Sequence, residues 1–444
     1  MNEKLNKFNE KLKSSKIAII GLGVSNVPLL EYLYDLGCDV VIFSDKEIEI
    51  DLSRYNYHCY IGEDSMKNLV GFDIIFRSPG CLPTNKYIQE EIRKGCYVTT
   101  EVAEVIKLAP CKIIGVTGSD GKTTTTTLID LVLRENGYKV WLGGNIGIPL
   151  FTKINKMKKE DIVVLELSSF QLMDMDVSPD ISVITNISPN HLDKHTDYQE
   201  YINSKCNIFK NSDGILILNA SNEVTKNISS SRDIRYFSRY DKTNCFYVLD
   251  RKIYFNDKIV FDTSKLCIRG EHNHENICAC MSAIYELVDL DKSFDVISKF
   301  KGVEHRLEFV REINGVKWYN DSVSSSPTRT IAGLNSYDEK IVLIAGGYDK
   351  NLDYDVLAVP IINKVSKLIL FGDTKDKIYQ AVINKKKDNI QIYVCNTLEE
   401  VIIKAKNVAI NGEVVLFSPA SASFDMFKNF ADRGVKFKEL VNKL

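Results

Sequence analysis

Residues 117–124 read T-G-S-D-G-K-T-T and follow a short apolar run, K-I-I-G-V at 112–116. An apolar run, a glycine-bearing turn and a lysine followed by threonines predict a strand that enters a phosphate-binding loop and continues as a helix. In such a loop the glycines bring backbone N–H groups close to phosphate oxygens, the lysine adds a positive charge, and the first threonine hydroxyl binds Mg²⁺. We therefore predict an ATP or GTP site formed by Gly118, Ser119, Asp120, Gly121, Lys122, Thr123 and Thr124.

The spacing of this loop differs from the usual G-x-x-x-x-G-K-T pattern. That pattern would place the first glycine at position 116, which is Val116, whereas Gly118 lies inside the window. The loop is a shortened variant, T-G-x-x-G-K-T. An ordinary strand-turn-helix with an exposed lysine is the alternative, but the preceding strand and the threonines from Thr123 to Thr127 favour phosphate binding.

Composition limits the possible classes of protein. The chain has 444 residues, of which 44% are hydrophobic and 26% charged, as in globular proteins, and this length suggests about three domains. A formal net charge of -2 argues against a large nucleic-acid-binding surface. No apolar segment is long enough to span a membrane, and residues 1–16 lack the apolar core of a signal peptide. We expect a cytoplasmic protein that acts as a monomer.

The alternation of apolar runs and helical segments predicts an α/β protein with three domains, at 1–100, 101–302 and 303–444. The first is expected to be Rossmann-like, because a strand at 15–21 leads into the turn G-L-G-V-S, a helix, and a second strand that ends at Asp45. Asn26 occupies the place of the third glycine of a dinucleotide fingerprint. The turn therefore binds another phosphate or nucleotide, or it only reverses the chain.

The central domain is expected to contain a parallel sheet around the phosphate-binding loop, with a β-rich appendage near 246–261. Its strand at 161–166 ends in Glu166, and an acid at that place commonly serves a magnesium ion near the loop. A helix cap or a solvated strand end is the alternative. After the next strand, His191 and His195 flank Asp193, and this crowding favours a metal or substrate contact over surface histidines.

A lysine interrupts the apolar face of the helix predicted at 198–209. By helical spacing, Lys205 lies among the tyrosine, isoleucine and phenylalanine side chains that face the core. Its stem either packs on the core while the ammonium reaches water, or the group serves the active site. A later helix, at 270–287, begins with Asn273 and Asn276, which share a face and either cap the helix or contact a ligand.

The third domain is expected to be a second Rossmann-like sheet. Apolar runs at 316–320, 341–345, 368–371, 390–394 and 414–418 alternate with helical segments. Polar residues follow three of these runs: Asp321, Asp349 with Lys350, and the S-P-A-S-A-S segment at 418–423. Because parallel sheets bind ligands at the carboxyl ends of their strands, these residues are candidates for chemistry.

Motifs along the whole chain resemble those of the Mur ligase family of cytoplasmic peptidoglycan enzymes. They are the phosphate-binding loop, G-G-N-I-G at 143–147, E-L-S-S-F-Q-L at 166–172, N-I-S-P-N-H-L-D at 186–193, H-N-H-E-N at 272–276 and E-H-R-L-E at 304–308. Within the family, S-S-F-Q-L and the segment S-P-A-S-A-S-F-D-M-F-K-N-F-A-D-R-G at 418–434 are most similar to the members that add D-glutamate.

The resemblance implies a reaction and its cofactors. ATP would phosphorylate the terminal carboxylate of UDP-N-acetylmuramoyl-L-alanine, and the D-glutamate amine would attack the acyl phosphate through a tetrahedral intermediate. Lys122, Thr123, Glu166 and His191 would hold ATP and two Mg²⁺ ions, and Lys205 corresponds to a lysine that family members carbamylate, so that it supports metal as a carboxylate. Further nucleotide contacts would be Asn273, Asn276, Arg306 and Asp321.

The same resemblance assigns residues to the two substrates. One departure is Val323 in N-D-S-V-S-S, where many members carry a lysine; the charge of Lys350 compensates in this interpretation. The uridine-nucleotide substrate would contact Val24, Ser25, Asp45, Ser78, Pro79, Gly80, Asn145 and His191. D-Glutamate would contact Ser325, Lys350, Ser423, Phe424 and Phe430.

Two other functions stay open. A related ligase would add a different amino acid or form folate polyglutamates. A nucleotide-driven switch belongs to another class, but the chain lacks the N-K-x-D signature of GTPases, and a switch leaves the third domain without a role.

Overall fold

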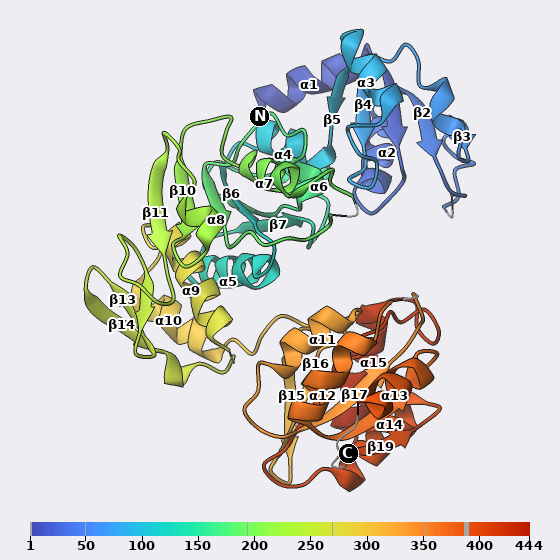
Figure 1. Ribbon diagram of the computed structural model, residues 1–444. Helices are drawn as coiled ribbons and strands as arrows, with labels where there is room; N and C mark the ends of the chain where they lie inside the picture. The colour runs from blue at the N-terminus through green and yellow to red at the C-terminus, as the bar shows by residue number, and fades with distance from the viewer. Residues whose placement is uncertain (1, 49, 193, 269, 351, 386–389) are drawn as a thin grey trace. The chain divides into compact units, whose positions relative to one another are not determined.

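The computed structural model describes residues 2–48, 50–192, 194–268, 270–350, 352–385 and 390–444. Contacts divide the chain into two compact units, Met1–Lys265 with Glu271–Ile297, and Leu266–Gly270 with Ser298–Leu444. Within the described ranges, the first unit holds two parallel sheets and a small antiparallel sheet, and the second holds one mixed sheet (Figure 1). The predicted α/β class is confirmed, while the domain boundaries stay predictions.

The first sheet is parallel, with strand order β3-β2-β1-β4-β5. Its central strands are apolar and buried on both faces, as parallel strands covered by helices are. The sequence pattern did not predict helix α1, whose Leu5, Phe8 and Leu12 form one buried face. The elements are α1 (Glu3–Lys13), β1 (Lys16–Ile20), α2 (Asn26–Asp35), β2 (Asp39–Ser44), β3 (His58–Ile61), the 3-10 turn η1 (Ser65–Asn68), β4 (Ile74–Arg77), α3 (Lys86–Arg93) and β5 (Tyr97–Thr99).

The second sheet is also parallel, with order β11-β10-β9-β6-β8-β7. Strand β6 lies between β8 and β9, so the carboxyl ends of these three strands meet at one edge of the sheet. The elements are α4 (Glu101–Leu108), β6 (Lys112–Thr117), α5 (Lys122–Glu135), β7 (Val140–Gly144), η2 (Phe151–Lys156), β8 (Ile162–Glu166), α6 (Ser169–Leu172), β9 (Ile181–Ile184), α7 (Tyr198–Cys206), β10 (Ile215–Asn219), α8 (Glu223–Lys226) and β11 (Asp233–Phe237).

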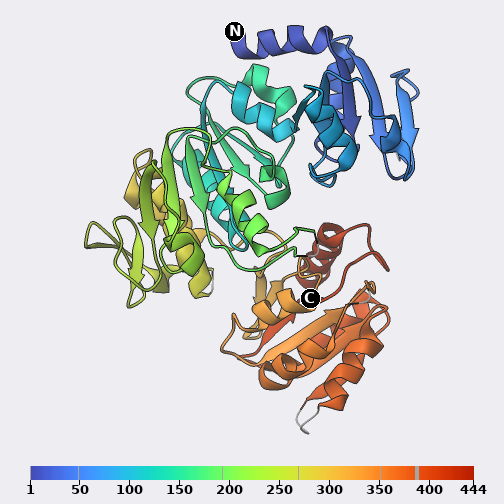
Figure 2. The ribbon, with the colours of Figure 1, turned by 45° about the horizontal axis from the view of Figure 1, so that its top comes forward.

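The predicted β-rich appendage is an antiparallel sheet, β12-β13-β14, and it lies beside helix α9 (Figure 2). Phe246 and Phe255 stack at 4.4 Å between ring centroids, and both rings contact Tyr285, which follows α9 directly. No helix in the described part of the chain is long and apolar enough to cross a membrane. The elements are β12 (Tyr247–Leu249), β13 (Lys252–Phe255), β14 (Lys258–Asp262), η3 (Thr263–Lys265), α9 (Glu271–Ile284) and α10 (Leu290–Lys299).

The second unit contains the sheet β15-β16-β20-β17-β18-β19. The five predicted strands are present and parallel, but β15 pairs with β16 as an antiparallel hairpin, so the sheet is mixed. Asn314 and Gly315 form the tight turn between them, both with positive φ, which such a turn requires. The elements are β15 (Glu308–Ile313), β16 (Val316–Asn320), α11 (Pro327–Leu334), β17 (Ile341–Gly346), η4 (Asp355–Leu357), α12 (Ala358–Lys364), β18 (Val365–Phe371), α13 (Lys375–Asn384), β19 (Gln391–Val394), α14 (Leu398–Val408), β20 (Val414–Phe417) and α15 (Phe430–Asn442).

Candidate active site

The predicted phosphate-binding loop connects β6 to the N-terminus of α5. Gly118 and Gly121 have φ of +152° and +77°, values that other residues rarely adopt. A side chain at Gly121 would collide with the amide of Asn276 from α9. The Asp120 N–H donates to Asn186 Oδ1 at 3.0 Å, which holds the loop against the end of β9. The loop thus has the shape that lets backbone N–H groups bind phosphate.

We predict that Gly118→Ala lowers the free energy of unfolding by about 2–3 kcal/mol. A Cβ at this position would meet the Thr185 hydroxyl and the Asn186 carbonyl oxygen, the latter at 3.1 Å, in a backbone conformation that L residues avoid. Chemical denaturation of the purified variant measures the change. Gly23→Ala is the control, since a Cβ there has no described heavy atom within 4 Å, and its stability should change by less than about 0.5 kcal/mol.

Two lysines meet at this loop. Lys122 Nζ donates to the carbonyl oxygens of Gly118 and Ser119 at 2.8 and 2.9 Å. Lys205 Nζ, from α7, donates to the same Gly118 oxygen at 2.7 Å and lies 4.6 Å from the centroid of the Tyr201 ring. Only 1% of Lys205 is exposed, so its ammonium does not reach water. The inward position is confirmed, and the alternative of a lysine extending into solvent is wrong.

Burial and charge act together on Lys205. Desolvation lowers its pKa well below the usual value, and the positive charge of Lys122 lowers it further. Both effects favour the neutral amine, which is the form that reacts with electrophiles such as CO₂. The environment of Lys205 therefore suits a chemically modified lysine better than a permanent cation.

Glu166 ends β8 beside the loop and is 1% exposed. Asn145 Nδ2 donates to its Oε1 at 2.7 Å, but among the described residues its buried Oε2 has no hydrogen-bond partner. The alternative of a solvated strand end is wrong, and the cap of the following helix α6 is Ser168. A buried carboxylate oxygen without a partner is costly in the free protein and suits a bound cation.

The two histidines near the loop have different surroundings. His191 is exposed, has a φ of +55°, and its ring lies 5.3 Å from that of Phe170. His195 is buried; its Nε2 lies 3.0 Å from Ser169 Oγ and its Nδ1 lies 3.3 Å from Glu200 Oε2. Asp193, the acid predicted between them, lies outside the described residues. The geometry places His191 where a ligand can reach it and gives His195 a packing role.

Asn276 of α9 contacts α5, and Asn273 contacts Asn276 on its own helix. Asn276 is buried, accepts a hydrogen bond from Thr125 Oγ1 at 3.4 Å, and donates through Nδ2 to Asn273 Oδ1 at 3.2 Å. The bond from Thr125 to Asn276 joins α9 to the helix that begins at Lys122. Of the remaining loop residues, Ser119 donates to the Ser188 carbonyl at 2.9 Å, while Thr123 is half-buried and Thr124 buried at the start of α5.

A cavity of about 430 Å³ lies in the first unit, where the turns after β1 and β4 approach the turn after β7. Asp45 does not line this cavity; it is exposed at the end of β2, although its charge acts on Cys81 beside the S-P-G turn. The cavity is also lined by four polar residues that the sequence motifs did not assign to a site, Arg77, Thr100, Glu101 and Gln171. It brings together six predicted residues, Val24, Ser25, Ser78, Pro79, Gly80 and Asn145.

Glu101, at the start of α4, binds the backbone just after the cavity-lining segment that ends at Pro149. Its Oε1 accepts the backbone N–H groups of Leu150 and Phe151 at 2.8 and 2.7 Å. Burial raises the pKa of Glu101 to about 7, and the two N–H donors only partly offset the effect. In the sequence, the only signal is the preceding Thr100, which caps α4, so this glutamate looked like an ordinary first-turn residue.

We predict that the ionisation of Glu101 lowers the free energy of unfolding of the wild-type protein as pH rises from about 4.5 to 7. The Glu101→Gln variant should not show this decrease. In that window the unfolded carboxyl is ionised while the folded one keeps its proton, so raising the pH favours unfolding. Above pH 7 the penalty is constant and of the order of 3 kcal/mol. Glutamine keeps an acceptor for both N–H groups. Urea denaturation of both proteins at several pH values would contradict this if the two curves ran parallel.

In the second unit, Arg306 and Asp321 lie at the end of the first hairpin. Asp321 is 3% exposed, and burial raises its pKa to about 6. Its Oδ2 accepts from Ser418 Oγ at 2.7 Å and its Oδ1 from the Leu307 N–H at 3.2 Å, so it joins the ends of β16 and β20 to the E-H-R-L-E segment. Arg306 is half-buried, and its charge acts on the Asp321 carboxyl.

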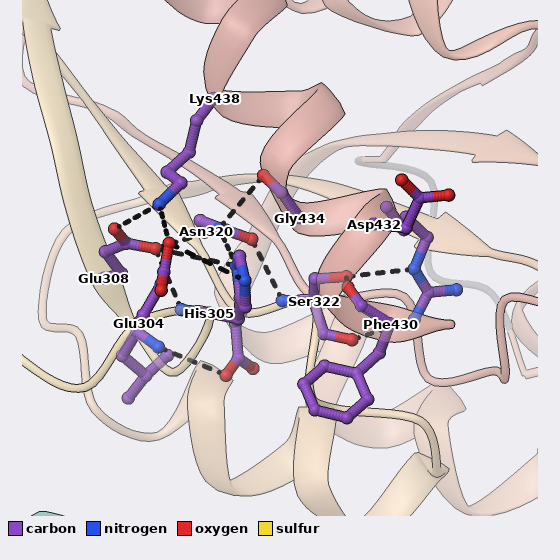
Figure 3. A network of polar contacts seen from close by, with 12 residues as sticks. Glu304, His305, Glu308, Asn320, Ser322, Phe430, Asp432, Gly434 and Lys438 are labelled. Atoms are coloured by element: carbon purple, nitrogen blue, oxygen red, sulfur yellow. Dashed lines mark hydrogen bonds and ion pairs between the residues drawn. The ribbon is translucent and has the colours of Figure 1, made fainter. Parts of the chain in front are cut away.

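A polar network attaches the E-H-R-L-E segment to α15 (Figure 3). Lys438 donates to Glu304 and Glu308 at 2.6 and 2.9 Å. Asn320 Nδ2 lies 3.0 Å from both His305 Nδ1 and Glu308 Oε2. His305 adopts a φ of +64°, and this strained conformation is held by the surrounding contacts. The network thereby fixes the backbone that precedes Arg306.

The predicted D-glutamate residues lie along the carboxyl edge of the same sheet. Lys350 is exposed, and its Nζ lies 5.4 Å from the centroid of the exposed Phe424 ring. Ser423 is buried, Ser325 is half-buried, and Phe430, at the start of α15, is exposed. Val323 is half-buried in the same segment as Ser325, so no cation occupies its position.

Arg433, which the motifs did not assign to a site, organises this edge. Its guanidinium is fully buried and donates to the carbonyl oxygens of Ala422, Ser322 and Ser421 at 2.8, 2.9 and 3.1 Å. Burial lowers the pKa of Arg433 to about 10. The sequence does contain a signal, because Arg433 lies four and eight residues before Phe437 and Val441, and helical spacing places all three on the buried face of α15.

Comparisons with known proteins cover the whole chain. The model of the Mur ligase middle domain matches residues 116–284, and that of the Mur ligase glutamate ligase domain matches 305–421. UDP-N-acetylmuramoylalanine–D-glutamate ligase of Clostridium botulinum is 44% identical over 458 aligned residues, with all of both chains covered.

Solved structures show the same fold at low identity. A UDP-N-acetylmuramate-alanine ligase of Thermotoga maritima is similar with a TM-score of 0.61 at 19% identity, over 97% of this chain and 99% of that one. The MurF ligase of Thermotoga maritima, solved with ADP, has a TM-score of 0.58 at 18% identity, over 100% and 99%. With the full-length relative and the two domain matches, these results show that the chain belongs to the Mur ligase family.

Proposed function

We propose that this protein ligates D-glutamate to UDP-N-acetylmuramoyl-L-alanine, with ATP as the energy source, in the synthesis of peptidoglycan precursors. The observation that carries the proposal is the 44% identity, over the full length of both chains, to proteins named for that reaction. The site supports it because the phosphate-binding loop, Glu166 and Lys205 lie together in one unit with the 430 Å³ cavity.

ATP binds at the loop in this proposal. The backbone of residues 118–121 and the ammonium of Lys122 contact its phosphates, and Asn273 and Asn276 support the helix that carries Lys122. Transfer of a phosphoryl group needs positioned substrates and neutralised charge rather than a nucleophile from the protein. The product of the first step is the acyl phosphate of the UDP-linked substrate.

The residues around the loop fit bound magnesium. Glu166 presents a buried carboxylate oxygen without a described partner, and the Thr123 hydroxyl lies at the start of α5. Lys205, once carbamylated, supplies a second carboxylate, and His191 is accessible to a ligand. We assign two Mg²⁺ ions to these residues. Bound magnesium supplies positive charge to the phosphate oxygens.

The substrates occupy separate groups of residues. The uridine-nucleotide substrate fills the cavity lined by Val24, Ser25 and the S-P-G turn, with Asn145 near its sugar-peptide end. D-Glutamate binds at the carboxyl edge of the sheet in the second unit, through Ser325, Lys350, Ser423, Phe424 and Phe430. Lys350 provides the positive charge that an acidic amino acid needs where Val323 provides none.

The proposal also covers the setting of the reaction. The protein acts in the cytoplasm, as a monomer, and needs no nucleic acid or membrane partner. The runner-up is a related ligase with another amino-acid substrate, because the residues that select the amine lie in a part of the chain with a departure from the family pattern, Val323.

Phosphate release in the presence of ATP, Mg²⁺ and UDP-N-acetylmuramoyl-L-alanine tests the proposal. We expect release only when D-glutamate is added, and none with L-glutamate, L-lysine or diaminopimelate. Turnover with L-lysine or diaminopimelate but not with D-glutamate would sink the assignment of the acceptor. Slow release that depends on neither substrate would indicate a nucleotide switch instead.

A further inference from the structure

Arg77 ends strand β4 immediately before the S-P-G turn and has a fully buried side chain. Its Nε donates to Asp174 Oδ2 at 2.8 Å, and its Nη2 donates to Asp174 Oδ1 and, at 3.1 Å, to the Phe170 carbonyl oxygen. Its Nη1 donates to the carbonyl oxygens of Cys81 and Ser78 at 3.2 and 3.5 Å. One guanidinium therefore joins two segments that are 97 residues apart in the chain.

The first of these segments lines the cavity assigned to the uridine-nucleotide substrate. Ser78 and Pro79 contact that cavity, and the carbonyl oxygens of Ser78 and Cys81 accept from Arg77 on either side of the turn. With these bonds in place, the turn cannot move without moving the guanidinium.

The second segment, 168–174, borders the cavity and follows the end of β8 that carries Glu166. It follows Glu166 by one residue and includes helix α6, whose Gln171 also lines the cavity. The Phe170 ring stacks on His195 at 5.2 Å and contacts His191 at 5.3 Å between ring centroids. A shift of this segment would therefore displace groups on both sides of it.

Direct binding of substrate phosphate by Arg77 does not fit these contacts. A guanidinium has five N–H groups, and in this structure all five are directed at protein oxygens. The Asp174 carboxylate binds the fork in the bidentate manner that arginine favours, with 27% of the Asp174 side chain exposed. A phosphate would have to displace the Asp174 carboxylate, which already binds Arg77 with two hydrogen bonds.

Resting on the proposed function, we propose that Arg77 and Asp174 form a positioning pair that couples binding of the UDP-linked substrate at the S-P-G turn to the position of segment 168–174 beside Glu166. Arg77 borders the cavity, but its N–H groups are bound to protein oxygens, so the pair holds the cavity wall in place and donates no hydrogen bond to the substrate. It keeps the cavity wall and the segment next to the magnesium-binding carboxylate in one arrangement, so that substrate binding orders both.

Steady-state kinetics of Arg77→Lys, Arg77→Met, Asp174→Asn and the double variant Arg77→Met/Asp174→Asn test the pair. We expect each single variant to raise KM for UDP-N-acetylmuramoyl-L-alanine about tenfold. The double variant should be no worse than the worse single one, since residues that act as a unit are not additive. Arg77→Lys keeps the charge but not the fork and should not rescue activity. A large effect of Arg77→Met with none of Asp174→Asn would overturn the pair in favour of a direct ligand.

Arg232 provides the matched control. It lies in the same unit and is buried. It donates to the carbonyl oxygens of Pro179 and Ser212, which precede the amino ends of β9 and β10. Arg232→Lys should lower the melting temperature and leave KM within twofold of the wild-type value. If it raises KM as much as Arg77→Lys does, the effect is only loss of stability and the coupling is wrong.

Hydrogen exchange gives a readout that loss of stability does not imitate. In the wild type and in Arg232→Lys, UDP-N-acetylmuramoyl-L-alanine alone should slow amide exchange in residues 168–174, and in Asp174→Asn it should not. Slowing retained in Asp174→Asn would refute the coupling. A wild type that does not use this substrate would instead contradict the proposed function, whereas an active wild type with unchanged variants would contradict only the positioning pair.

Discussion

Lys205→Ala is expected to lower kcat about a thousandfold, and a short carboxylate such as formate should restore part of the lost activity. Addition of CO₂ to the neutral amine forms an N–C bond and releases one proton, which turns the lysine into a carbamate anion. Burial and the neighbouring Lys122 favour the neutral amine that this step requires. Turnover of the variant across a series of formate and acetate concentrations measures the rescue.

The choice of rescuing compound separates two roles for this lysine. If Lys205 acts as an ammonium that donates to the Gly118 carbonyl, methylamine should rescue the variant and formate should not. Lys205→Arg keeps a cation and should stay inactive with formate, because the arginine side chain fills the space the carboxylate needs. Full activity of Lys205→Ala without any addition would leave the residue with a packing role alone.

Glu166→Gln is expected to lower kcat/KM about a thousandfold and at the same time to keep or raise the melting temperature. The wild-type carboxylate is buried, with one oxygen bonded to Asn145 and the other without a described partner. Removing its charge ends the cost of burying it, but also removes the site for a cation. Turnover as a function of Mg²⁺ concentration and thermal unfolding without ligands measure the two effects.

Glu104→Gln is the control for this change. Glu104 is equally buried, but its Oε1 accepts from Tyr97 and Thr99 hydroxyls at 2.5 and 2.6 Å, and Lys107 lies 3.6 Å away. Because this carboxylate has partners, its neutral variant should be less stable and should keep its kcat. A Glu166→Gln protein that loses as much stability as Glu104→Gln, or that keeps its activity, would show that Glu166 is a structural carboxylate.

Local sequence patterns were sufficient for most of the fold. The strand and helix on either side of residues 118–121, the strand that ends at Glu166 and the inward face of Lys205 follow from periodicity and from the needs of glycine turns. The antiparallel strand β15 was not predicted, because its E-F-V-R-E-I pattern is half polar and became a strand through pairing with β16.

Sequence motifs identified some of the candidate site residues but not others. Motifs identified the loop, the S-P-G turn and Asn145, and the cavity brings the last two together. Motifs also suggested Asp45, which does not line that cavity. Arg77, Glu101 and Arg433 were not predicted, because a charge at a strand end or in a helix is usually solvated, whereas the folded chain buries all three.

The sequence by itself determined the phosphate-binding loop, the strand before it, the helix after it and the inward position of Lys205, because these depend on residues within one or two turns of each other. Tertiary structure decided which charges are partnered. Arg77 finds Asp174 across 97 residues, whereas among the described residues one oxygen of Glu166 finds no partner. The physical reason is that desolvation and pairing depend on distances in space, which no local spacing in the chain reveals.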